Sequence, residues 1–216
     1  EIYMGDWSSD VCSSDLFLAA KPFCHDRAPP HLIPKEPIMA NNNYYDATGV
    51  LVLDKVTPVI SALFGGFKLD ASYPGNGEAY IARISEANNP SWDEVFENLN
   101  DLAANLPLSS SERDRESISA VLQLLSRHFN AADDEALRQL IEHHDFRDTD
   151  VGLDTLFVIA TRFDDGHGLK AIKWEGAWHC SKPRLFEFAG NGLYISKSVY
   201  TIWRSEERRV GKECRS

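Results

Sequence analysis

Residues 164–168 (DDGHG) have the side-chain types that acid–base chemistry requires. Asp164, Asp165 and His167 supply two carboxylates and an imidazole, and the glycines let a loop bring such groups onto one reacting atom or one divalent cation. This pattern is typical of a small metal-dependent hydrolase or nuclease-like enzyme. It is also typical of a helix end followed by polar turn residues. We favour the helix end, because no larger catalytic motif accompanies the loop.

A second group of residues combines aromatic rings with basic side chains: Trp174, Trp178, His179, Lys182 and Arg184. Such a face can stack nucleic-acid bases or anchor a protein partner. The alternative is that these rings pack between a sheet and its helices. We expect one face of this region to be core and the other, with Lys173, His179 and Lys182, to be exposed surface.

The remaining histidines and cysteines do not form a recognisable metal motif. His143 and His144 are adjacent, so on a helix they point about 100° apart, and His179 and Cys180 point to opposite faces of a strand. Neither HExxH nor a paired CxxC is present in the sequence. A Cys180 nucleophile would need a base such as His167, whereas a lone cysteine is more often a small buried hydrophobe. The sequence therefore predicts neither a metal site nor a cofactor.

Both ends of the chain resemble translated sequencing adapters. Arg-Ser-Glu-Glu near the C-terminus can be encoded by AGA TCG GAA GAG, whose reverse complement in another frame gives the Cys-Ser-Ser-Asp-Leu found near the N-terminus. Lys35-Glu36 can be written AAG GAG, a ribosome-binding sequence shortly before Met39. We therefore expect residues 1–38 to be disordered adapter and leader translation, residues 39–203 to be one globular domain, and residues 204–216 to be an adapter-derived tail.

The composition of residues 39–203 restricts the class of protein. This stretch has 14 Lys and Arg residues against 24 Asp and Glu residues, which gives a net charge of −10. Such acidity makes direct nucleic-acid binding unfavourable and repels anionic membranes. The acidic residues could serve DNA mimicry or the binding of basic partners, but we favour the simpler interpretation that they keep the protein soluble. Cys180 is the single cysteine of residues 39–203, which fits a reducing cytoplasm. No run approaches the ~20 apolar residues of a membrane span, so we expect a cytoplasmic protein that does not bind membranes.

Hydrophobic periodicity and turn residues predict the order of the elements. Thr57-Pro58 starts a helix that Gly65-Gly66 ends as a left-handed C-cap. Ser91 with Glu94 forms a capping box at the start of the next helix. Strands are predicted at 49–53, 67–70 and 79–85, helices at 58–64, 91–106, 109–129, 133–144 and 153–163, and strands again at 169–174, 177–181, 184–188 and 193–196. Turns are predicted at 73–77, 175–176 and 190–192, and a last element near Val199. Strands, then helices, then strands indicate an α+β single domain in which an antiparallel β-meander packs against four to five helices.

Several stretches resemble a family of small proteins carried on bacterial integrative and conjugative elements. They are YYDATGVLVLDKVTPVI at 44–60, YPGNGEAYIARI at 73–84, LFVIATRFDDGHGL at 156–169 and CSKPRLFEF at 180–188. The resemblance covers nearly all of residues 39–200 and implies a bacterial cytoplasmic protein on mobile DNA. The family has no established activity, so the resemblance implies no catalytic residues. We expect a non-enzymatic, acidic accessory protein whose partner is another protein.

Overall fold

The strand β1 (Asn43–Val52) lies at the centre of a six-stranded sheet in the computed structural model, which describes residues 43–108, 116–147, 150–180 and 189–205. The strand order is β2-β3-β1-β4-β5-β6, and all neighbouring strands are antiparallel. The other strands are β2 (Asp70–Gly75), β3 (Glu78–Arg83), β4 (Ala171–Cys180), β5 (Ala189–Ser196) and β6 (Tyr200–Ser205). The last three form a meander beside β1, which confirms the α+β prediction.

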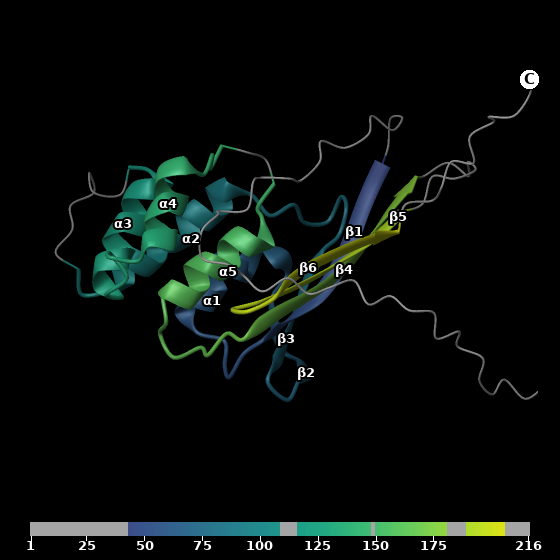
Figure 1. Ribbon diagram of the computed structural model, residues 1–216, viewed down its shortest axis with the longest axis horizontal. Coiled ribbons are helices and arrows are strands. Elements are labelled where there is room, and N and C mark those ends of the chain that lie inside the picture. Colours follow the sequence, from purple (N-terminus) through teal and green to yellow (C-terminus); the bar gives the residue numbers. More distant parts are fainter. Residues whose placement is uncertain (1–42, 109–115, 148–149, 181–188, 206–216) are drawn as a thin grey trace, which may run out of the picture.

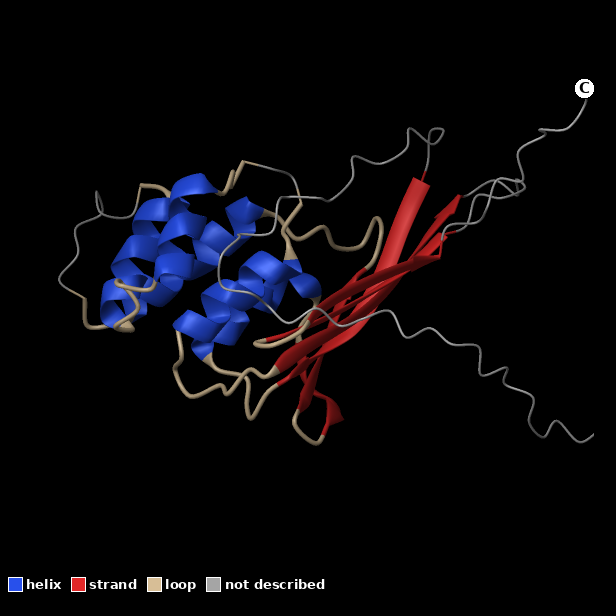
Figure 2. Cartoon of the chain, viewed as in Figure 1, coloured by secondary structure: helices blue, strands red, loops and turns tan. Residues whose placement is uncertain are grey.

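In the described part of the chain, helices cover one face of the sheet and no helix covers the other (Figure 2). Along β1, Ala47 and Leu51 face the helices and are buried, whereas Thr48 lies between them on the other face and is exposed. The helical layer contains α1 (Pro58–Phe64), η1 (a 3₁₀ turn, Gly65–Phe67), α2 (Trp92–Asn105), α3 (Ile118–His128), α4 (Glu135–His143) and α5 (Leu153–Arg162). Figure 1 shows that the sheet extends past this layer at the end where β1 begins and β4 ends. We call this the projecting end of the sheet.

The helices begin where local capping residues allow. Ser91 caps α2 by accepting the amide of Glu94 at 3.3 Å, as the capping box predicts. Asp134 caps α4 through the amide of Leu137 at 2.9 Å, close to the predicted start. The helix predicted from Ser109 instead starts at Ile118 with Ser117 as its cap, and residues 109–115 lie outside the described part of the chain. The predicted apolar stripe of α2 faces the core: Trp92, Val95, Leu99, Leu102 and Ala103 are buried, and Phe96 and Leu106 are half-buried.

The strand predicted at residues 67–70 was wrong. Gly65–Phe67 continue α1 as a 3₁₀ turn, and β2 begins only at Asp70 and includes residues predicted as a turn. Lys68, with φ of 51°, takes the left-handed conformation that was expected of the glycines, whereas Gly65 is helical. The reason is tertiary: Phe67 is buried and packs edge-on against Trp174, with ring centroids 5.8 Å apart.

The turns predicted at residues 175–176 and 190–192 were also wrong, because both lie inside strands. β4 runs unbroken through Gly176, and β5 runs through Gly192. A Cβ atom at Gly176 would collide with the Tyr45 ring, and one at Gly192 would collide with the Trp203 indole. These glycines therefore allow large side chains of neighbouring strands to lie flat on the sheet. The strand predicted at 184–188 lies outside the described residues, and the element expected near Val199 is β6, which continues to Ser205.

Candidate functional site

The loop that follows α5 places Asp165 against the start of α1. One carboxylate oxygen of Asp165 accepts the Thr57 hydroxyl at 2.6 Å, and the other accepts the Val59 amide at 3.1 Å. Thr57 itself makes no side-chain cap, so Asp165 caps α1 from more than 100 positions away in the sequence. Both carboxylate oxygens of Asp165 therefore accept hydrogen bonds from within the protein.

His167 is 2% exposed and is held by backbone groups on both ring nitrogens. Its Nε2 lies 3.0 Å from the Ala160 carbonyl oxygen, and its Nδ1 accepts the Leu169 amide at 2.8 Å. This pairing places the proton on Nε2. Asp164, in contrast, is exposed and accepts the Gly166 amide at 2.9 Å. The loop therefore connects α5, α1 and the end of β1 through hydrogen bonds, and its groups do not converge on one point.

Removal or addition of divalent metals is expected to leave the melting temperature unchanged within about 1 °C, because binding to the folded state alone would raise it. The described residues contain no group of three His, Cys, Asp or Glu side chains that could hold an ion. The measurement is a thermal melt with EDTA, Mg²⁺, Mn²⁺ or Zn²⁺. A rise with one metal that disappears in both Asp165→Ala and His167→Ala would instead support the hydrolase or nuclease hypothesis.

The aromatic and basic residues that could have formed one binding face lie on two faces of the sheet, and Lys173 is exposed on the face opposite the core. Trp174 is 5% exposed, lies in the core and donates its indole N–H to the Tyr45 hydroxyl at 3.1 Å. Trp178 is half-buried on the same face at the projecting end, 4.6 Å from the Tyr45 ring. His179 points to the opposite face, where it stacks on Tyr44 at 5.5 Å and lies 3.8 Å from an Asp46 oxygen. Lys182 and Arg184 lie outside the described residues.

The edge strand β6 has the densest exposed apolar surface in the described part of the chain. Tyr200, Ile202 and Trp203 are 40%, 48% and 49% exposed, and three of the four large exposed hydrophobic residues are therefore in this one strand. Partial burial raises the pKa of the Tyr200 phenol to about 12, and the carboxylate of Asp154 at the start of α5 contributes to the rise. Tyr200 and Ile202 face the helical side, and Trp203 lies over Gly192 on the uncovered side.

The two edges of the sheet differ in how they resist a further strand. β2 contains Pro74, which has no amide hydrogen, and its register with β3 shifts between Asp70 and Pro74. Prolines and irregular register are devices that stop a sheet from pairing with another chain. β6 keeps a regular register with β5 from Tyr200 to Ser205 and contains no proline, and Arg204 is its one charged residue. The β6 edge therefore lacks these protections.

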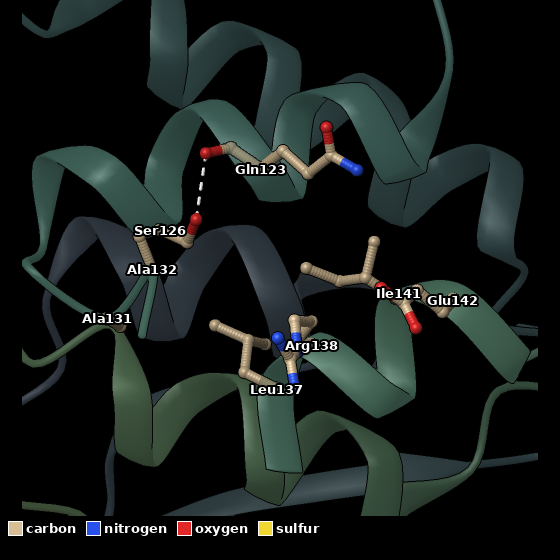
Figure 3. A pocket seen from close by; sticks show the side chains of 8 residues that line it. All are labelled: Gln123, Ser126, Ala131, Ala132, Leu137, Arg138, Ile141 and Glu142. Carbon is tan, nitrogen blue, oxygen red and sulfur yellow. Dashed lines mark hydrogen bonds between the residues drawn. The ribbon is translucent and has the colours of Figure 1, made fainter. Parts of the chain in front are cut away.

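Two hollows in the helical layer are poor sites for a small molecule. The hollow between α3 and α4 (Figure 3) has a volume of about 70 Å³ and is lined by Gln123, Ser126, Ala131, Ala132, Leu137, Arg138, Ile141 and Glu142. Ligand pockets are typically ~300–1,000 Å³, so this one is too small. A wider hollow of about 530 Å³ beside Arg162 and Lys197 is open to solvent, and Arg162 is already paired with Asp134 at 3.1 Å.

Sequence reasoning did not identify Tyr200, Ile202 and Trp203 as site residues. The signal was present, since YTIW is a short uncharged run rich in strand-forming residues after a two-residue hairpin turn. Its position at the sheet edge depends on pairing with β5, which the local sequence does not encode.

No helix in the described ranges is long and apolar enough to span a bilayer. Comparison of the chain with protein-family models, with curated proteins and with solved structures finds no match.

Proposed function

We propose that this chain is a non-enzymatic interaction protein whose β6 edge binds an extended segment of another protein. The observation that carries the proposal is the exposure of Tyr200, Ile202 and Trp203 on an edge strand that has neither proline nor charge between residues 200 and 203. An added strand would gain backbone hydrogen bonds from β6 and would cover these side chains.

The surroundings of the candidate acid–base residues favour a non-enzymatic protein. Asp165 and His167 use their polar atoms in hydrogen bonds to Thr57, Val59, Ala160 and Leu169. A general acid or base must instead be within reach of a substrate proton. The net charge of −11 also favours a protein partner over the phosphate backbone of a nucleic acid. An accessory role on a bacterial mobile element, in the cytoplasm, is part of the same proposal and is supported by the resemblance of residues 44–188 to such proteins.

Ile202→Pro is expected to abolish binding while the protein stays folded. The Ser196 amide donates to the Val199 carbonyl at 2.8 Å, and hydrogen-bonded pairs alternate along an antiparallel ladder, so the backbone groups of Tyr200 and Ile202 point away from β5. The change therefore removes an amide on the outer side of an edge strand, where proline is tolerated. The measurement is selection of displayed random 12-residue peptides on the folded chain, followed by anisotropy titration of the enriched peptides against each variant. We expect at least a tenfold loss of affinity, which corresponds to ~1.4 kcal/mol.

Two further variants make this test specific. Ile202→Lys keeps the amide but removes the apolar contact and places a charge at the edge, so it should also weaken binding. The side chain at this position is 48% exposed, so the change should leave the fold intact. Tyr73→Lys makes the same kind of change on β2, at the other sheet edge, and should leave binding intact. Binders that are insensitive to both Ile202 variants, or equally sensitive to Tyr73→Lys, would contradict the proposal.

A further inference from the structure

Two rows of side chains lead from β6 across the helical side of the sheet into the core. They are Ile202, Leu193 and Trp174, and Tyr200, Ile195 and Ile172. The residues that β4 contributes to these rows are at most 5% exposed, and both β5 residues are part of the core or pack against it. Side chains directly opposite one another on neighbouring strands interact. A strand added beside β6 would therefore extend both rows, and its apolar residues on this side would gain contact with Tyr200 and Ile202.

The uncovered side of the same edge is polar apart from its aromatic rings. The two rows on this side are Thr201, Tyr194 and Lys173, and Trp203, Gly192 and Glu175. Thr201, Lys173 and Glu175 are exposed. The indole of Trp203 lies over Gly192, so it is directed toward β5 and away from the free edge. An apolar side chain of an added strand would stay in contact with water on this side and would gain little, so polar residues are favoured there.

The hydrogen bonds that β6 offers determine which residues of a partner face which side. The backbone groups of Tyr200 and Ile202 point away from β5. All described ladders of the sheet are antiparallel, and antiparallel pairing is slightly more stable per residue than parallel pairing. In an antiparallel partner, the residues that bond to Tyr200 and Ile202 lie directly opposite them, with their side chains on the helical side. The residues between these direct their amides away from β6 and their side chains to the uncovered side.

We infer that β6 binds an antiparallel, amphipathic strand whose apolar side chains, at every second position, face the helical side of the sheet. The inference rests on the proposed function and specifies the chemistry of the partner. The apolar residues of this strand are also the ones whose amides bond to β6. Its intervening residues are polar, and their amides point to solvent.

The first test compares two fluorescein-labelled peptides of identical composition by anisotropy titration with the full chain. One alternates, Gly-Ser-Val-Thr-Val-Thr-Val-Ser-Gly, and the other, Gly-Ser-Val-Val-Thr-Thr-Val-Ser-Gly, has no two valines separated by one residue. We expect the alternating peptide to bind about fivefold more tightly, which is roughly the contribution of one cross-strand apolar pair. Equal affinities that are both lost in Ile202→Pro would overturn the amphipathic pattern and leave the docking edge of the proposed function.

The second test methylates single backbone amides of the alternating peptide. Methylation of the central valine removes the amide that bonds to Ile202 and should weaken binding about tenfold or more. Methylation of the threonine next to it alters an amide that points to solvent and should change the affinity by less than about twofold. Sensitivity at threonine instead of valine would mean a parallel partner and would overturn the inferred orientation.

The third test places one charge on each side of the same strand. Ile202→Lys puts a lysine on the helical side and should weaken binding of the alternating peptide about tenfold or more. Thr201→Lys puts the same charge on the uncovered side, at an exposed position, and should leave the affinity within about twofold. Because the added charge is equal, a difference between the variants reports the side on which the partner makes its apolar contacts. Equal losses would overturn the inference.

Two further outcomes separate this inference from the proposed function. Failure of both peptides to bind at millimolar concentration, while peptides from the random selection still depend on Ile202, would overturn the amphipathic partner alone. A dimer in light scattering that Ile202→Pro dissociates would assign the edge to a second copy and would overturn both.

Discussion

Replacing Trp174 with alanine is expected to lower the free energy of unfolding by about 3–5 kcal/mol. The indole is 5% exposed, packs edge-on against Phe67 and donates its N–H to the Tyr45 hydroxyl. Its loss leaves a cavity between the sheet and the helical layer and removes a hydrogen bond from Tyr45, which also donates to Asn191 at 3.0 Å. Urea unfolding followed by circular dichroism measures the change.

Two variants calibrate that result. Trp174→Phe keeps most of the packing and loses the indole N–H, so it should recover a large part of the stability. Trp178→Ala removes a ring that is half-buried and touches Tyr45 at the projecting end, and we expect a loss of about 1–2 kcal/mol. A Trp174→Ala protein as stable as the parent, with impaired partner binding, would instead support the binding role for which Trp174 was a candidate from the sequence.

Asp165→Ala is expected to lower the free energy of unfolding by about 2–3 kcal/mol. The change leaves the Val59 amide at the start of α1 without its acceptor, although Val59 is completely buried, and also frees the Thr57 hydroxyl. A buried donor without a partner loses its contact with water and gains nothing in exchange, which is why the expected loss exceeds that of an exposed cap. Thermal and urea unfolding report the effect directly.

The matched control for this prediction is Asp164→Ala. Asp164 is one position away and carries the same charge, but it is exposed and accepts only the local Gly166 amide. We expect its replacement to change stability by less than about 0.5 kcal/mol. Equal losses in the two variants would mean that the negative charge of the loop, and not the cap on α1, provides the stability.

The helices could be predicted from the sequence because their signals are local. α1 spans Pro58–Phe64 as predicted from Thr57-Pro58 and the following apolar run, and the Ser91 cap of α2 is formed as predicted. N-caps and 3.6-residue spacing involve residues within a few positions of one another. The start of α3 was misplaced because several serines compete as caps, and packing of the Val121, Leu122 and Leu125 stripe decides among starts.

The strands were less predictable, since their bounds depend on partners far away in the chain. Gly176 and Gly192 have the composition of turns, yet the side chains of Tyr45 and Trp203 lie on them in continuous strands. Phe67 alternates with its neighbours like a strand residue, yet contact with Trp174 holds it in a 3₁₀ turn. In each case a long-range contact overrides the local preference.

The sequence by itself determined the residue types available for chemistry, the acidity of the chain and the α+β class. Only the tertiary structure decided which of those residues are accessible. Asp165 and His167 have the side chains of an acid–base pair, but the fold brings backbone donors and acceptors to them, because buried polar groups require partners. Tyr200, Ile202 and Trp203 are an ordinary apolar run until pairing with β5 places them at the edge of the sheet, where their side chains meet solvent and the backbone groups of Tyr200 and Ile202 point outward.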